Sequence, residues 1–259
     1  MLKKLIHYEK SDAGLLRQNN EDHFIVFDQY SREYDLQQLG MIFVIADGMG
    51  GHLAGEVASR MACEEVVAAY YGKYFNIPDD AEDGEWQMDK LEKAIWAAHK
   101  KLINFAAEQK ELRGMGTTLS ALVLANDKAL IAHVGDSRIY RYRNNFCERV
   151  TVDHTKNQAM IDTGQILPDR EKNHFCSHII TQALGGYNDL DAVFTRLDDV
   201  QDGDVFLLST DGLHDLVTDR EIQEILMNNP VPQSACDALV QAAINKGGHD
   251  NITVIVVKI

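Results

Sequence analysis

The stretch MIFVIADGMGGHLAGEVAS, residues 41–59, joins a continuous apolar run to an aspartate and then to three glycines within four positions. Glycines after a strand are typical of phosphate-binding loops, because backbone N–H groups can approach a phosphate closely there. This stretch has neither the Gly-Lys-Ser/Thr of a P-loop nor the G-x-G-x-x-G spacing of a dinucleotide-binding loop. Asp47, at the end of a predicted strand over 41–46, is therefore the residue to explain.

Apolar runs rich in β-branched residues predict strands along much of the chain. Asn126-Asp127 and Asp136-Ser137 lie between successive runs and are typical of turns, so residues 118–143 are predicted to form one antiparallel meander. The predicted strands are residues 23–27, 41–46, 118–125, 129–135, 138–143, 204–210 and 252–259.

The spacing of apolar residues predicts helices over 54–74 and 88–109. Residues 218–221 (TDRE) form a capping box ahead of a third helix, and a fourth over 235–245 is predicted to begin at Ser234. Strands come in groups with helices between the groups, rather than in strict alternation. We therefore expect an α+β fold with two packed antiparallel sheets covered by helices.

Composition limits the classes of protein that the chain can represent. Its 259 residues are 45% hydrophobic and contain four prolines and no Pro-rich or Gly/Ser-rich linker, so we expect a single domain over 1–259. The formal charge of -15 argues against a nucleic-acid or anionic-membrane partner. No apolar run reaches about 18 residues, so neither a signal peptide nor a membrane span is predicted. The cysteines form no C-x-x-C pair, which fits the reducing cytoplasm.

Four aspartates share one feature, which is their position where a predicted buried strand meets a loop. They are Asp47, Asp136, Asp211 and Asp250. Any one of them alone is most simply a turn residue. If all four strand ends lie at one rim, however, the carboxylates repel one another unless cations lie between them. Ligation by oxygen alone favours Mg²⁺ or Mn²⁺ over zinc.

Hard cations held by carboxylates suit the hydrolysis of phosphate esters. Two such ions can activate one water and neutralise charge on the phosphoryl oxygens. In SDAGLLRQNNEDHF (11–24), Arg17 offers a planar guanidinium that can bind two phosphate oxygens at once. The alternative for Arg17 is a surface salt bridge with Glu21.

A series of motifs in fixed order now supports a family resemblance. The chain resembles the metal-dependent PPM or PP2C-like serine/threonine protein phosphatases in their bacterial form. That resemblance covers nearly the whole chain and implies a four-layer αββα sandwich with a binuclear metal site between the sheets. The motifs are SDAGLLRQNNED (11–22), ADGMGGHLAGEVAS (46–59), GMGTTLSALVL (114–124), AHVGDSRIYRY (132–142), TQALGG (181–186), LLSTDGLHDLV (207–217) and GGHDNITVIVV (247–257).

The resemblance assigns the metal ligands. It implies that Asp47 bridges two Mn²⁺ or Mg²⁺ ions, that the carbonyl of Gly48 binds one of them, and that Asp211 and Asp250 complete the other. By the same resemblance, Asp136 is the ligand, shared with Asp211, of a third and weaker ion.

The resemblance also assigns residues around the metals. Glu21 and Asp22 match acidic positions that bind a metal or orient its waters, and Arg17 matches the arginine that binds the phosphate. Asn251 supports Asp250 or is simply a buried, satisfied amide. The implied mechanism is direct attack on phosphoserine or phosphothreonine by a metal-bridging hydroxide, so Arg17, Asp47 and Asp211 are the predicted catalytic residues.

The chain departs from the family pattern at a few positions. Animal relatives have a histidine, proposed as general acid, where this chain has Met49, and His52 is better explained by capping or packing than as its substitute. We expect a metal-bound water or another side chain to protonate the leaving oxygen. Gln182 stands where many relatives carry arginine.

The segment 153–180 resembles the mobile flap near the third metal site. Its mixed polarity is also typical of a solvated helix and loop, and as a flap it would influence which phosphoproteins enter. His154, His174 and His178 lie in it without ligand spacing, so we expect them to be surface residues.

The sequence thus predicts a cytoplasmic, monomeric phosphatase that acts on phosphorylated proteins and opposes a bacterial serine/threonine kinase. One alternative is a catalytically silent module of the same fold that binds phosphoproteins. Another is a different two-metal phosphoesterase such as a nuclease, which the charge of -15 argues against.

Overall fold

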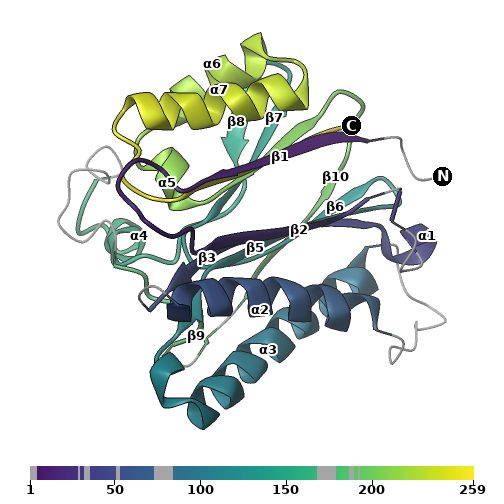
Figure 1. The fold of residues 1–259 in the computed structure, drawn as a ribbon. Coiled ribbons are helices and arrows are strands. Elements are labelled where there is room, and N and C mark those ends of the chain that lie inside the picture. Colours follow the sequence, from purple (N-terminus) through teal and green to yellow (C-terminus); the bar gives the residue numbers. More distant parts are fainter. Residues whose placement is uncertain are drawn as a thin grey trace.

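Two antiparallel β-sheets face each other and carry helices on their outer faces, so the molecule has four layers (Figure 1). The structure is a computed structural model that describes residues 5–28, 30–31, 36–50, 53–72, 84–167, 179–186, 190–191 and 193–259. This arrangement confirms the predicted αββα sandwich.

The five-stranded sheet has the order β1-β12-β11-β7-β8. Its strands are β1 (Ile6–Asp12), β7 (Arg138–Arg143), β8 (Phe146–Arg149), β11 (Val205–Ser209) and β12 (Ile252–Lys258). The seven-stranded sheet has the order β10-β6-β5-β3-β4-β9, with β2 paired to β3. Its strands are β2 (Asp22–Phe27), β3 (Met41–Met49), β4 (Gly116–Thr117), β5 (Leu119–Ala125), β6 (Lys128–Val134), β9 (Leu184–Gly185) and β10 (Phe194–Asp199).

Two long helices cover the seven-stranded sheet and three shorter ones cover the five-stranded sheet (Figure 1). The first pair is α2 (Leu53–Tyr71) and α3 (Glu85–Glu108), which pack on each other. The other three are α5 (Asp211–His214), α6 (Asp219–Asn228) and α7 (Pro232–Asn245). Two short helices, α1 (Leu36–Leu39) and α4 (Lys156–Asp162), and the 3₁₀ turn Lys110–Leu112 lie in the connections. None of the helices in the described ranges has the length and apolar character needed to cross a bilayer.

The central strands are buried on both faces, which explains their continuous apolar runs. In β12, Val254 and Val256 pack with the core under α5, α6 and α7, whereas Ile255 and Val257 belong to the core that includes the seven-stranded sheet. Successive side chains of a strand point to opposite faces, so one apolar run supplies both cores.

The meander predicted over 118–143 is wrong. Strands β5 and β6 do form a hairpin, closed at Asn126 and Asp127, but β7 belongs to the other sheet. Strand β6 already has β5 on one edge and β10 on the other, so no edge is left for β7. The chain therefore crosses between the sheets at Gly135–Ser137, which carries Asp136 to the boundary between them.

Helix boundaries lie within three positions of the predictions. Helix α2 spans Leu53–Tyr71 against the predicted 54–74, and α3 spans Glu85–Glu108 against the predicted 88–109. The capping box is present, because Thr218 and Glu221 exchange hydrogen bonds at the start of α6. Helix α7 begins at Pro232, three positions before the predicted 235, and Ser234 donates a hydrogen bond to the carbonyl of Val231 instead of capping the helix. Proline suits the first turn of a helix because no N–H is needed there.

Candidate metal centre

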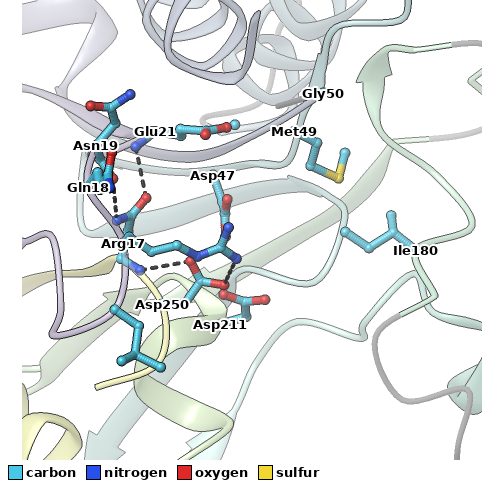
Figure 2. Close-up of a pocket in the computed structure, with 13 residues that line it drawn as sticks. Arg17, Gln18, Asn19, Glu21, Asp47, Met49, Gly50, Ile180, Asp211 and Asp250 are labelled. Carbon is cyan, nitrogen blue, oxygen red and sulfur yellow. Dashed lines mark hydrogen bonds and ion pairs between the residues drawn. The ribbon is translucent and has the colours of Figure 1, made fainter. Parts of the chain in front are cut away.

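One pocket of about 560 Å³ opens at the boundary between the sheets and collects most of the predicted site residues (Figure 2). Its lining includes Arg17, Glu21, Asp47, Gly48, Asp211 and Asp250. Strand β3 supplies Asp47 and Gly48, while β11 and β12 of the other sheet lead to Asp211 and Asp250. The structure therefore brings these strand ends together, as the sequence predicts. Asp22 and Asp136 lie behind the lining and are buried.

Asp22 and Asp47 are direct cross-strand partners of the β2–β3 pair. Two carboxylates placed opposite each other destabilise a sheet unless their charge is compensated. The backbone around Asp47 is held by Thr118, whose hydroxyl accepts from the Asp47 amide at 2.9 Å, and by the Thr118 amide, which donates to the Asp47 carbonyl at 2.9 Å. These bonds fix the strand end at which Asp47 lies.

Two glycines allow α2 to approach the end of β3. A Cβ atom at Gly48 would collide with the carbonyl of Gly55, and one at Gly55 would collide with the carboxylate of Glu21. Glycine is therefore required for close backbone approach at this point, not for binding a phosphate.

Asp22 connects the two sheets. Its Oδ2 accepts hydrogen bonds from the hydroxyls of Thr210 at 2.8 Å and Thr253 at 2.7 Å, which belong to the five-stranded side. Neither threonine was singled out in the sequence, although both lie in the quoted motifs. The motifs STDG and NITV contain these threonines, but a search for charged ligands does not single out a hydroxyl.

Asn251 ties Asp250 to the N-terminal segment. Its side chain accepts from the Glu21 amide at 2.8 Å and donates to the carbonyls of Asn19 and Ala13, while its own amide donates to Asp250 Oδ1 at 2.9 Å. Both interpretations of Asn251 thus apply, since its amide is satisfied and it supports Asp250.

Arg17 forms an ion pair with Asp250. The distance between Arg17 Nη2 and Asp250 Oδ2 is 2.6 Å, and the arginine side chain is 53% exposed at the mouth of the pocket. The hydrogen bond to Asp250, with further contributions from the charges of Asp250, Glu21 and Asp211, raises the pKa of Arg17. Asp250 is thus the ion-pair partner of Arg17, in the place of the alternative partner Glu21.

Simultaneous ionisation of the buried carboxyl groups of Asp22, Asp47 and Asp136 is strongly disfavoured. Burial, followed by the charges of Asp211, Asp22 and Asp136, raises the pKa of Asp47 well above its usual range. Burial and then the charge of Asp211 do the same for Asp136. Burial raises the pKa of Asp22 to about 7, although Thr253 and Thr210 oppose the shift. Repulsion among acids in a desolvated site produces this pattern.

The donor set fits divalent cations that keep part of their water shell. Within the described residues, Asp22 Oδ1 and Asp136 Oδ1 are buried without a hydrogen-bond partner. No three His, Cys, Asp or Glu side chains in those ranges are arranged to hold one ion among themselves. A closed protein cage of the zinc type is therefore absent from the described part. Mg²⁺-like ions need only one or two carboxylates each and keep several waters, which this cluster can accommodate.

The residues of the predicted flap and the departures from the family pattern are only partly described. His52, His174, His178 and the segment 168–178 lie outside the described residues. His154 is a correction, because it is partly buried, packs against the ring of His133 and accepts from the Gly135 amide at 3.2 Å. Gln182 Oε1 accepts from the Asp191 amide at 3.1 Å.

Comparisons with known proteins show the family of the chain. The family described as Protein phosphatase 2C matches residues 19–242. The chain is 35% identical over 250 residues to the serine/threonine phosphatase stp of Listeria innocua, covering 96% of this chain and 94% of the relative.

Solved structures give the same result. The serine/threonine phosphatase PstP/Ppp of Mycobacterium tuberculosis is similar with a TM-score of 0.83 at 33% identity, covering 98% of each chain. The catalytic domain of PstP in complex with two manganese ions is similar with a TM-score of 0.79 at 33% identity, covering 98% of this chain and 97% of that one.

Proposed function

The chain belongs to the protein phosphatase 2C family of serine/threonine phosphatases, and we propose that Asp47, Gly48, Asp211 and Asp250 hold the two divalent ions that its reaction requires. The convergence of carboxylates from both sheets on one pocket is the observation that carries this proposal. The ions are Mn²⁺ or Mg²⁺, and Asp136, with Asp211, is the site of a third and weaker one.

The ions supply an activated water and neutralise charge on the phosphoryl oxygens. The chain's own residues place the substrate and fix the ligands. Glu21, held through its amide by Asn251, and Asp22, held by two threonine hydroxyls, form the rear of the site and orient water within it. Polar groups that are held in place before the reaction lower the free-energy cost of reorganising the site during it.

Arg17 binds the phosphate of the substrate. Its guanidinium is directed into the pocket by Asp250 and remains exposed at the mouth, where an incoming phosphate can accept from its other N–H groups. A planar guanidinium can bind two phosphate oxygens at once, which fixes the orientation of the phosphoryl group.

Hydrolysis joins a water oxygen to phosphorus, breaks the bond between phosphorus and the serine or threonine oxygen, and delivers a proton to that oxygen. Met49, which also lines the pocket, has no proton to give. The proton therefore comes from a water or from another side chain of the site.

The substrates are proteins phosphorylated on serine or threonine, and the opposing enzyme is a bacterial serine/threonine kinase. We place the protein in the cytoplasm as a monomer. The free thiols of Cys63, Cys147 and Cys236 support a reducing compartment. Size-exclusion chromatography with light scattering should give the mass of one chain, 29.1 kDa.

The test is phosphate release from a phosphothreonine peptide and from p-nitrophenyl phosphate. We expect release with Mn²⁺ or Mg²⁺ and none after chelation, and loss of release in Asp47→Asn. Asp237→Asn is the matched control, because Asp237 lies on α7 and pairs with Lys10 outside the pocket.

Three results would overturn the proposal. Hydrolysis that survives chelation would remove the metal mechanism. Binding of phosphopeptide without any hydrolysis would identify the silent module instead, and cleavage of nucleic acid would identify a different phosphoesterase.

A further inference from the structure

The described lining of the pocket contains three apolar side chains among its carboxylates, amides, glycines and one arginine. Leu16 is 68% exposed, whereas Met49 and Ile180 are partly buried. Figure 2 shows both on one side of Asp47, Asp211 and Asp250, with Gln18 and Asn19 on the other side. Neither side chain can bind a cation or a phosphate. Both are partly exposed, so core packing alone does not explain their position.

Met49 is fixed by the sheet. It is the last residue of β3 and pairs with Gly116 of β4, which in turn pairs with Gly185 of β9. Its backbone therefore belongs to a continuous ladder one residue beyond Gly48.

Ile180 is fixed by a separate set of contacts. It forms an isolated antiparallel bridge with Thr155, flanked by hydrogen bonds from Lys156 to the Ile179 carbonyl and from Thr181 to the His154 carbonyl, both 2.8 Å. His154 in turn donates through its amide to the Gly135 carbonyl at 2.7 Å. Ile180 is thus anchored to the crossover that carries Asp136.

Because the backbone at both residues is held in place before any ligand arrives, little backbone conformational entropy is lost when something packs on their side chains. The phosphate of a substrate is directed to Arg17 and the carboxylate cluster. The residues next to the phosphorylated one must then leave the pocket along its walls, and the wall formed by Met49 and Ile180 offers contact only to apolar groups. Arg17 is the only cation among the described residues of the lining, so an acidic residue next to the phosphorylated one finds no further positive charge there.

We propose that Met49 and Ile180 form an apolar subsite that selects phosphorylated segments with an aliphatic side chain adjacent to the phosphorylated residue. This inference rests on the proposed phosphatase function of the same pocket and adds a substrate class to it. Met49, which stands at the position of the missing histidine, thereby acts in substrate selection.

The test compares phosphothreonine peptides that differ in the residue on either side of the phosphothreonine. Leucine and glutamine are compared because both are uncharged and of similar length, so the comparison isolates apolar contact from charge repulsion. We expect kcat/KM for the better leucine peptide to exceed that for its glutamine counterpart by about tenfold, the scale of an apolar pocket contact.

The variants Met49→Gln and Ile180→Asn should each reduce that ratio toward one. Ile179→Asn is the matched control, because Ile179 is the neighbouring isoleucine, is 46% exposed and does not line the pocket. It should preserve the ratio.

A contact measurement supplies a second readout. With methyl-¹³C methionine, Mg²⁺ and a non-hydrolysable phosphonate analogue of the leucine peptide, the Met49 methyl signal should shift, while that of Met227, which is 48% exposed outside the pocket, should stay. The Met49→Gln variant assigns the signal.

The outcomes separate the two proposals. If p-nitrophenyl phosphate and all peptides remain intact with Mn²⁺, the proposed function fails and this inference with it. If they are hydrolysed but the leucine-to-glutamine ratio is near one, or is unchanged by both pocket variants, the apolar subsite alone is refuted.

Discussion

Asp136 and Asp153 are both buried, only 7% and 5% exposed, and lie close together, yet their environments differ completely. Asp153 receives hydrogen bonds from Nε and Nη2 of Arg138, an arginine that is itself buried. Asp136 has an oxygen without a hydrogen-bond partner in the described residues, and its pKa is raised by burial and by the charge of Asp211. The chain thus supplies a hydrogen-bonded counter-charge for Asp153, whereas we propose that Asp136, with Asp22 and Asp47, is compensated by an external cation.

This contrast separates carboxylates that stabilise the fold from those that serve the reaction. A buried charge is tolerated only when it is paired and hydrogen-bonded. Where the protein contains the partner, removing that partner should damage the fold. Where the partner comes from solution, removing the carboxylate should damage the function and relieve repulsion.

The largest expected effect follows from removing Arg138, the counter-charge that the protein itself supplies to Asp153. Arg138→Met should lower the free energy of unfolding by about 3–5 kcal/mol, because the buried Asp153 loses its hydrogen-bonded partner and keeps only the contact with Arg149 at 3.6 Å. Urea unfolding measures the loss, which Mn²⁺ should not restore. Arg220→Met is the matched control, since Arg220 is 87% exposed and its i,i+4 pair with Glu224 should contribute less than about 1 kcal/mol. A loss as small as that of the control would abolish the distinction.

The next effect concerns Asp47, one of the carboxylates whose proposed counter-charge is an external cation. Asp47→Asn should lower kcat/KM by more than about a hundredfold, because Asp47 is one of the residues that we propose would hold the ions. Its melting temperature in chelator should be no lower than that of the wild type, since one repelling charge is gone. A variant that loses stability as Arg138→Met does would show that Asp47 is a structural carboxylate.

Metal binding should stabilise the folded state by a smaller amount. At a Mn²⁺ concentration of about 100 times Kd, the gain is about 2.7 kcal/mol, which corresponds to a rise in melting temperature of roughly 5–10 °C. Differential scanning fluorimetry with and without chelator measures it. Arg138→Met should keep the rise and Asp211→Asn should lose most of it; a rise that persists in Asp211→Asn would point to another site.

The smallest effect concerns His7, whose charge, and therefore whose pairing with two acidic residues, depends on pH. His7 lies 3.1 Å from Glu9 and 3.0 Å from Asp28, and these hydrogen bonds, that of Glu9 first, raise its pKa. The resulting stability is present below the unfolded pKa of about 6.5 and is lost as the pH rises through the higher pKa of the folded state. His7→Gln should remove this pH dependence, worth less than about 1 kcal/mol. Equal slopes in urea titrations of both proteins between pH 6 and 8 would contradict it.

Prediction from sequence worked where strands are buried and failed at the edges of the sheets. All seven predicted strands exist. Five strands of the described ranges are not predicted. Strands β1, β8 and β10 lie at sheet edges and carry charged, partly exposed residues, and β4 and β9 are only two residues long. Edge strands lack the apolar run that marks a central strand, because one side of their backbone faces no partner.

The sequence alone determined the family, the αββα fold and the candidate ligands, because each of the four aspartates lies where a buried strand meets a loop, within a local motif. Only the tertiary structure decided which sheet each strand joins, that Gly135–Ser137 crosses between sheets, and that Arg17 pairs with Asp250. It also placed Met49 beside the carboxylates together with Ile180, although 130 positions separate the two in the sequence. These contacts join residues far apart in the chain, so no local pattern of apolar and charged residues encodes them. They arise when two sheets bury their facing surfaces and bring separate strand ends to one rim.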